Sequence, residues 1–287
     1  MRVLNKRPYP AKILLFGEYT VLHGGSALAV PYHRYVGRWA DAIVSPYHLQ
    51  PFFDHLSTIQ IDLHAQFDKD LVQELQLRPL SFDSDIPVGQ GLGSSAALTA
   101  ATYDLASTLP DPLALQKSDL ALIEGFFHGT SSGVDALVCY RDAPIYRSAE
   151  GLEETHLPSR QALRAYLWIT GQARSTEPLV AWFQEALTNQ AFKSQVERLA
   201  QYSSTAVDQL LQGELTLADV KNISNIQWQH MSALIPSSVR HFWQGTLDDE
   251  HVAIKLCGAG GGGSFLLFSD GVDLCEKFPD YMFERLW

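Results

Sequence analysis

The chain has 287 residues, of which 46% are hydrophobic and 18% charged, a composition typical of a soluble globular protein with a substantial core and not of a disordered chain. Its formal net charge of −11 argues against nucleic acid or an anionic membrane as the main partner, because both bind basic surfaces. No apolar run is long enough to cross a bilayer, no signal peptide is expected before residue 17, and the three widely spaced cysteines predict reduced thiols in a cytoplasmic protein.

The first half of the chain is predicted to contain strands followed by helices. Strands are expected where apolar residues run together or alternate with polar ones, at residues 12–16, 26–30, 35–44 and 58–63. Helices are expected at 93–107, which is rich in small helix-forming residues, and at 118–127.

The second half of the chain is predicted to be rich in helices. A buried strand at 164–170 precedes three helical segments and two final strands, at residues 176–187, 191–211, 215–234, 253–256 and 264–268. Glycine, proline and charged residues cluster at 150–163. We therefore expect two domains, residues 1–155 and 156–287.

The most informative segment is a glycine-serine loop that runs into the helix predicted at 93–107. It consists of Gly89, Gln90, Gly91, Leu92, Gly93, Ser94 and Ser95. Its glycines can adopt positive φ and bring backbone close to a ligand. Ser94 or Ser95 is a good helix N-cap, and a helix N-terminus attracts anions. The segment predicts a phosphate-binding loop, and a plain glycine-rich turn is the alternative.

A second glycine-rich run, residues 258–263, lies between two predicted strands. Its G-x-G-x-x-G spacing is not of the Rossmann type, because that loop must open a helix. The run indicates close approach of backbone either to a ligand or to a neighbouring loop. No Walker-type loop, zinc-protease spacing or Gly-x-Ser-x-Gly elbow occurs in the sequence.

Three segments in the same order, residues 10–25, 89–95 and 255–263, resemble the three signature motifs of the GHMP kinases. They span nearly the whole chain, and together they are far more specific than any one of them. Residues 124–135 and 170–181 make the resemblance strongest to the mevalonate-kinase branch. The resemblance implies an α+β fold of two domains, with nucleotide and acceptor bound in the cleft between them.

The resemblance implies an ATP- and Mg²⁺-dependent kinase that transfers the γ-phosphate of ATP to an alcohol, with mevalonate as the expected acceptor and 5-phosphomevalonate as the product. Two departures leave other functions open: Tyr19 replaces the histidine usual after Gly-Glu, and the chain is shorter than many relatives. The alternatives are another acceptor (phosphomevalonate, homoserine or a sugar) and an inactive nucleotide-binding regulator. A homodimer is also left open.

Four residues are candidates for the chemistry. Asp135 is the candidate base that accepts the hydroxyl proton. Lys12 lies in an apolar strand, so a charge partner is expected, and the resemblance places it beside Asp135. Ser95 and Glu124 supply the oxygen ligands that Mg²⁺ prefers, and the resemblance assigns both to the metal. The alternatives are a capping role for Asp135 or Ser95, a Lys12 that reaches solvent, and an exposed position for Glu124.

A further set of residues is expected near the acceptor. Glu18, Tyr19 and His23 follow the first strand, and Arg174 follows a later strand at a position where a guanidinium could clamp a carboxylate or phosphate. Gly260 and Gly261 belong to the second glycine-rich run. A structural role for His23 and a surface position for Arg174 are the alternatives.

Overall fold

The computed structural model describes residues 7–41, 49–59, 62–64, 80–107, 113–173 and 175–287. The chain folds into two compact units, neither of which is continuous in sequence. The first unit comprises residues 1–13, 29–88 and 92–145, and the second comprises residues 14–28, 89–91 and 146–287. The boundary expected between residues 155 and 156 stays a prediction.

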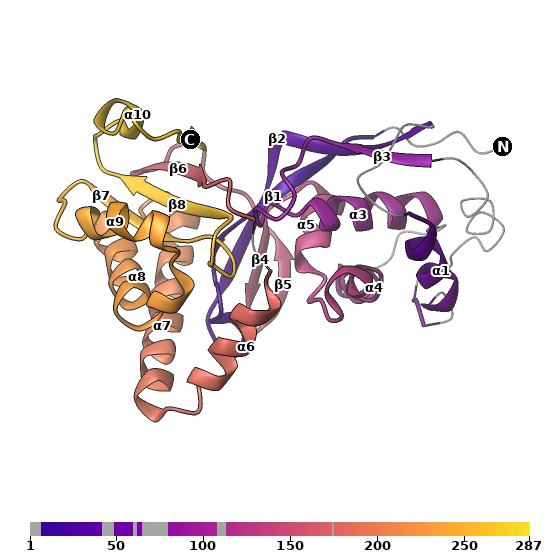
Figure 1. Cartoon of the computed structure of the whole chain (residues 1–287), viewed down its shortest axis with the longest axis horizontal. Coiled ribbons are helices and arrows are strands. Elements are labelled where there is room, and N and C mark those ends of the chain that lie inside the picture. Colours follow the sequence, from indigo (N-terminus) through magenta and orange to yellow (C-terminus); the bar gives the residue numbers. More distant parts are fainter. Residues whose placement is uncertain (1–6, 42–48, 60–61, 65–79, 108–112, 174) are drawn as a thin grey trace. The chain divides into compact units, whose positions relative to one another are not determined.

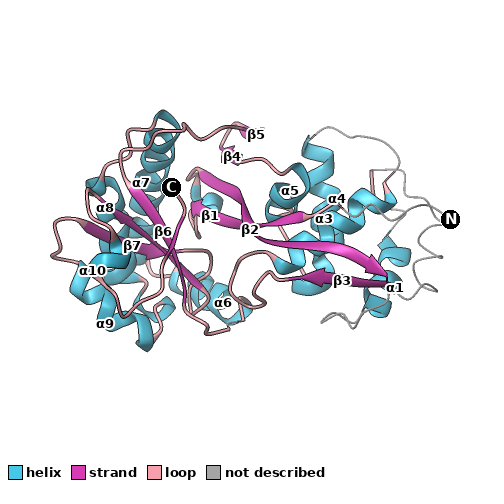
Figure 2. Cartoon of the chain, turned by 90° about the horizontal axis from the view of Figure 1, so that it is seen from above, coloured by secondary structure: helices cyan, strands magenta, loops and turns pink. Residues whose placement is uncertain are grey.

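Among the described residues, one sheet contains five strands in the order β1-β2-β4-β5, with β3 paired to β2. The strands are β1 (Tyr9–Phe16), β2 (Ala27–Asp41), β3 (Leu80–Ser84), β4 (Ile145–Ser148) and β5 (Gly151–Glu154). Figure 2 shows β3 running beside the long strand β2, and Trp39 pairs there with Phe82 in antiparallel register. Both aromatic side chains are buried.

The strands expected at 26–30 and 35–44 are confirmed as strand in their described residues, but they belong to one strand, β2, of 15 residues; residues 42–44 lie outside the described residues. Its middle residues, 31–36, are half-buried or exposed. The apolar pattern is therefore interrupted there although the backbone pairing continues.

The helices of the first unit are α1 (Leu49–Ile59), α3 (Ser94–Ala106), α4 (Leu113–His128) and α5 (Val134–Arg141). Helices α3, α4 and α5 pack against one another, and α1 packs on α4 (Figure 1). Fully buried alanines along α3 allow its neighbours to approach closely. Helices α3 and α4 confirm the two helices expected in this part of the sequence.

The predicted strand at 58–63 was wrong in its described residues. Residues 58 and 59 end α1, and residue 62 lies in a turn. Phe52, Phe53 and Leu56 are buried, and the Phe52 ring lies 5.4 Å from that of Phe126 on α4. These apolar residues follow helical spacing, and their packing on α4 outweighs the short alternating pattern after them.

The second unit contains an antiparallel sheet in the order β7-β8-β6-β9. Its strands are β6 (Arg164–Ile169), β7 (Val252–Leu256), β8 (Ser264–Ser269) and β9 (Glu284–Arg285). Its helices are α6 (Glu177–Ala186), α7 (Gln190–Gln212), α8 (Leu217–His230), α9 (Ser237–Thr246) and α10 (Leu274–Lys277), with 3₁₀ turns η1 (Val21–His23) and η2 (Ser232–Leu234). Helix α8 packs on α7 and on β7 (Figure 1).

The strands and helices expected in this half are confirmed, with one correction. The single helix predicted at 215–234 is broken at Met231, where α8 ends and η2 begins. The start of α8 is fixed by a capping box between Thr216 and Asp219. In the part of the chain that the structure describes, no helix combines the length and apolarity that a membrane crossing requires.

Candidate active site

The glycines of the predicted phosphate loop adopt the expected backbone conformation. Gly89, Gly91 and Gly93 have φ of 74°, 77° and 80°. A Cβ on Gly93 would lie 2.8 Å from Cγ of Lys12, so the close passage of the loop past β1 requires glycine there. The backbone N–H of Lys12 donates to the carbonyl oxygen of Leu92 over 2.9 Å.

The N-cap prediction at this helix was wrong. Helix α3 starts at Ser94, its N-cap is Gly93, and no side chain caps it. The first backbone N–H groups of α3 therefore donate no hydrogen bond to a capping side chain, which suits a loop that binds an anion.

The structure brings Lys12 and Asp135 together within the first unit. The Nζ of Lys12 lies 2.7 Å from Oδ2 of Asp135, and the two side chains are 6% and 40% exposed. Asp135 lies in the first turn of α5, and the N-cap of α5 is Gly133 with φ of 73°. The expected charge partner of Lys12 is thus present, and the carboxylate of Asp135 also reaches solvent.

Glu124 on α4 is buried, so the exposed-helix interpretation is excluded. The hydroxyl of Ser131 donates to its Oε2 over 2.5 Å. Burial, and next the negative charge of Asp135, raise the pKa of Glu124 to about 7, although Ser131 and Lys12 oppose the shift. Glu124 is therefore a buried carboxyl close to the charges of Asp135 and Lys12, and an added cation would favour its ionised form.

Ser95 and the last residue of α4 form a contact that the sequence did not predict. The Oγ of Ser95 lies 3.1 Å from Nε2 of His128. His128 stands four residues after Glu124, so the two side chains share one face of α4. That spacing was the signal in the sequence that could have pointed to His128.

The donor chemistry of this group fits magnesium. A carboxylate and a hydroxyl are hard oxygen donors, and Mg²⁺ is commonly held by one or two protein oxygens together with substrate phosphates. Within the described part of the chain, no group of three or more His, Cys, Asp or Glu residues is arranged to hold a metal ion.

In the second unit, Glu18 forms a buried ion pair with Lys255, a residue of β7 to which the sequence analysis gave no role. The two side chains are 2% and 0% exposed. The Nζ of Lys255 also donates to the carbonyl oxygens of Leu15 and Leu256, over 2.8 and 2.6 Å. Burial raises the pKa of the Glu18 carboxyl, and Lys255 opposes this shift. The expected contact between Glu18 and the acceptor stays a prediction. In the structure, the carboxylate of Glu18 is already paired with Lys255.

Tyr19 and His23 border a cavity of about 280 Å³ in the second unit. The Tyr19 hydroxyl donates to the carbonyl oxygen of Ala259 over 2.7 Å, and its ring stacks on Phe183 at 4.4 Å between centroids. Phe183, on α6, is a lining residue that the sequence analysis missed. The proximity of the Tyr19 segment to the second glycine-rich run is thus established within this unit.

Gly260 and Gly261 contact protein neighbours. A Cβ on Gly260 would lie 2.6 Å from the carbonyl oxygen of Leu234, and one on Gly261 would lie 2.6 Å from Cδ1 of Leu179. The approach of neighbouring segments explains both glycines, and their role near the acceptor stays a prediction. Arg174 lies outside the described residues.

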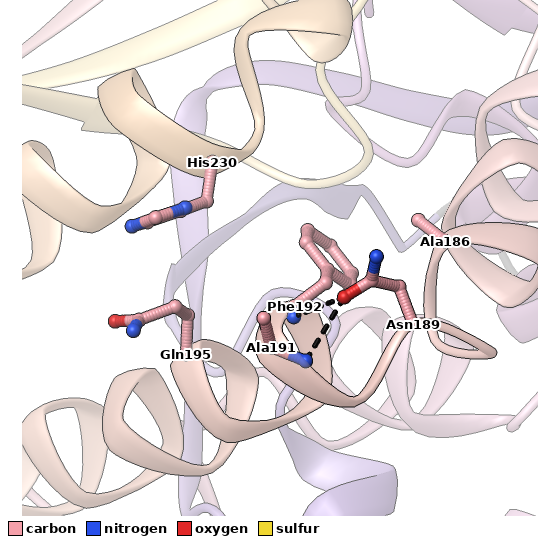
Figure 3. Close-up of a pocket in the computed structure, with 6 residues that line it drawn as sticks. All are labelled: Ala186, Asn189, Ala191, Phe192, Gln195 and His230. Carbon is pink, nitrogen blue, oxygen red and sulfur yellow. Dashed lines mark hydrogen bonds between the residues drawn. The ribbon is translucent and has the colours of Figure 1, made fainter.

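A separate open cavity of about 440 Å³ lies at the start of α7 (Figure 3). Asn189 Oδ1 accepts hydrogen bonds from the backbone N–H groups of Ala191 and Phe192, drawn as dashed lines in the figure. Because this side chain already satisfies these N–H groups, the helix start offers little to an anion. We assign no role in the reaction to this cavity.

The sequence matches a known protein family and known relatives. A model of the GHMP kinases N terminal domain matches residues 61–142. The mevalonate kinase of Pyrococcus abyssi is 26% identical over 308 aligned positions, which cover 91% of this chain and 88% of the relative.

Two solved structures have the same fold. The L. major mevalonate kinase in complex with R-mevalonate matches with a TM-score of 0.62 at 18% identity, over 99% of this chain and 95% of that one. The Streptococcus pneumoniae phosphomevalonate kinase in complex with phosphomevalonate and AMPPNP matches with a TM-score of 0.68 at 17% identity, over 98% of each chain.

These findings confirm the resemblance predicted from the sequence. By its α+β fold and by the match at residues 61–142, the chain resembles the GHMP kinase family. Within that family its resemblance is to the mevalonate kinases, as the relative from Pyrococcus abyssi indicates.

Proposed function

We propose that this protein is an ATP- and Mg²⁺-dependent kinase that phosphorylates an alcohol, with mevalonate as the acceptor and 5-phosphomevalonate as the product. The observation that carries the proposal is the pair of Lys12 and Asp135, 2.7 Å apart, in the same unit as Ser95 and the buried Glu124. The mevalonate-kinase relative supports the choice of acceptor.

In the proposed reaction, the acceptor oxygen forms a bond to the γ-phosphorus while the bond from that phosphorus to the β–γ bridging oxygen breaks and ADP leaves. Asp135 aligns the acceptor hydroxyl and takes its proton as the new bond forms. Lys12 orients the carboxylate of Asp135 through their ion pair and stabilises negative charge that develops on the transferring group. Little covalent chemistry is required of the protein, so positioning and charge stabilisation dominate.

The residues proposed to hold the nucleotide are those of the loop at 89–95, whose backbone and helix start suit phosphate groups. Ser95 and Glu124 are proposed to hold Mg²⁺, which supplies charge neutralisation of the phosphates when bound. The proposed acceptor contacts remain Glu18, Tyr19, His23, Arg174, Gly260 and Gly261.

A second candidate keeps the fold and the chemistry but changes the acceptor. Tyr19 stands where the family usually has histidine, and its hydroxyl and ring are both engaged by protein neighbours. This difference favours testing phosphomevalonate, homoserine and galactose beside mevalonate.

The test is a panel of these acceptors with ATP and Mg²⁺, with ADP release measured for the purified protein. We expect ADP release to rise above the acceptor-free rate with mevalonate. Activity on another acceptor alone would replace mevalonate in the proposal. Activity on none of them, with nucleotide binding intact, would favour a nucleotide-binding regulator.

A further inference from the structure

His128 stands at the end of α4 and contacts the serine that we propose as a magnesium ligand. Its Nε2 lies 3.1 Å from Oγ of Ser95, across 33 residues of sequence. The carbonyl oxygen of His128 accepts a hydrogen bond from the backbone N–H of Thr130 over 2.8 Å, which closes the helix end. Both residues belong to the first unit.

A serine hydroxyl carries one proton and two lone pairs. If the proton points toward an incoming cation, the oxygen is a poor ligand, so the proton needs an acceptor elsewhere. The Ser95 side chain makes no capping hydrogen bond at the start of α3. A neutral imidazole nitrogen is an acceptor, and Nε2 of His128 lies at hydrogen-bond distance.

We propose that His128 is a positioning residue, whose Nε2 accepts a hydrogen bond from the hydroxyl of Ser95 and thereby directs the oxygen lone pairs of Ser95 toward the Mg²⁺ of the bound nucleotide. The inference rests on the proposed function and extends it to a residue beyond the proposed ligands. His128 acts through Ser95 and touches neither the acceptor nor the transferring phosphoryl group.

Direct ligation of the metal by His128 is the less suitable role. Mg²⁺ prefers oxygen ligands and is seldom held by imidazole. A hydrogen-bonding partner behind a ligand is a common device at metal sites, and its loss typically lowers metal affinity about 10- to 100-fold. The lower part of that range is expected here, because Glu124 remains in place.

The test compares two variants. His128→Leu cannot accept a hydrogen bond from the Ser95 hydroxyl. In His128→Gln, the amide oxygen can reach the place of Nε2 and accept that hydrogen bond. The probe is the analogue AMPPNP, whose dissociation constant is measured by titration calorimetry with Mg²⁺ and again with EDTA. We expect His128→Leu to weaken the Mg²⁺ complex about 10-fold and to leave metal-free binding within about 2-fold. His128→Gln should restore most of the loss.

His156→Leu is the matched control, since His156 is an exposed loop residue, and thermal unfolding checks that each variant is folded. The inference would be overturned if His128→Leu weakened AMPPNP binding equally with and without Mg²⁺, or did not weaken it at all. It would also be overturned if His128→Gln bound the Mg²⁺ complex as weakly as His128→Leu. If the wild-type protein bound AMPPNP no better with Mg²⁺ than without it, the proposed function itself would fail, a result distinct from these.

Discussion

Two lysine–carboxylate pairs, one in each unit, differ in what surrounds them. Lys12 and Asp135 form a pair in which the Asp135 side chain is 40% exposed. The backbone of Lys12 is hydrogen-bonded to Leu92 in the loop at 89–95. Lys255 and Glu18 form a pair that is almost wholly enclosed, and Lys255 is further engaged by two carbonyl oxygens.

The difference shows that residue type alone does not identify a reactive carboxylate. The side chain of Asp135 is open to solvent, so its carboxylate can exchange contacts with other molecules. Glu18 cannot leave Lys255 without stranding a buried charge, which is costly. The pair of Lys12 and Asp135 therefore suits a role in a reaction. The pair of Lys255 and Glu18 links the segment after β1 to the end of β7.

The largest expected effect comes from Asp135→Asn, which keeps the shape of the side chain and an oxygen for Lys12 but removes the base. We expect kcat to fall about 10²- to 10⁴-fold, while the dissociation constant for ATP stays within about 3-fold. Steady-state turnover and nucleotide titration measure the two quantities. Wild-type turnover in this variant would remove Asp135 from the proposed chemistry.

The next effect concerns the enclosed pair. Lys255→Met leaves Glu18 buried without its cation and should lower the free energy of unfolding by about 3–5 kcal/mol, measured by urea titration. Combining it with Glu18→Leu should recover much of the loss, because no charge remains to be buried. If Lys255→Met were as stable as the wild type, the ion pair would not stabilise the contact between the two segments.

The pH dependence of stability tests the environment of Glu124. Its pKa is raised to about 7 from an ordinary value of 4.5, so between these values the folded protein binds more protons than the unfolded chain. Stability without metal should therefore fall as pH rises from about 4.5 to 7, with a contribution from Glu124 of up to about 3 kcal/mol.

The measurement is the free energy of unfolding at several pH values in EDTA, for the wild type and for Glu124→Gln. Subtracting the two profiles isolates Glu124 from Glu18, whose pKa is raised as well. Parallel profiles would mean that the carboxyl of Glu124 is not held in a low-polarity environment.

The smallest effect is expected for Tyr19→Phe, which removes the hydrogen bond to Ala259 and keeps the stacking on Phe183. A loss of about 0.5–1.5 kcal/mol in unfolding free energy is typical for one such bond. If Tyr19 also selects the acceptor, KM for the acceptor should change while KM for ATP does not. Unchanged stability and unchanged KM values would leave Tyr19 without either role.

Features that depend on neighbouring residues were predictable from the sequence. The positive φ values at Gly89, Gly91 and Gly93 follow from the absence of a Cβ, and α3 follows from the small helix formers after them. The need of Lys12 for a charge partner also follows from its apolar strand. The identity of that partner came from the resemblance and not from the spacing.

Features that depend on distant segments were not predictable. Glu18 and Lys255 are separated by 237 residues, and nothing local shows that they meet. The capping role expected of Ser94 or Ser95 was wrong because Gly93 occupies the N-cap position and Ser95 turns to His128 on another helix. Tertiary contacts decided both outcomes.

Phosphoryl transfer can be observed directly by following the γ-phosphate of labelled ATP in the presence of Mg²⁺ and mevalonate. We expect the label on the terminal hydroxyl oxygen of mevalonate with the wild-type protein, and we expect Lys12→Met and Asp135→Asn to form this product far more slowly while still binding ATP. Undiminished transfer by either variant, or label released only as inorganic phosphate by the wild type, would contradict it.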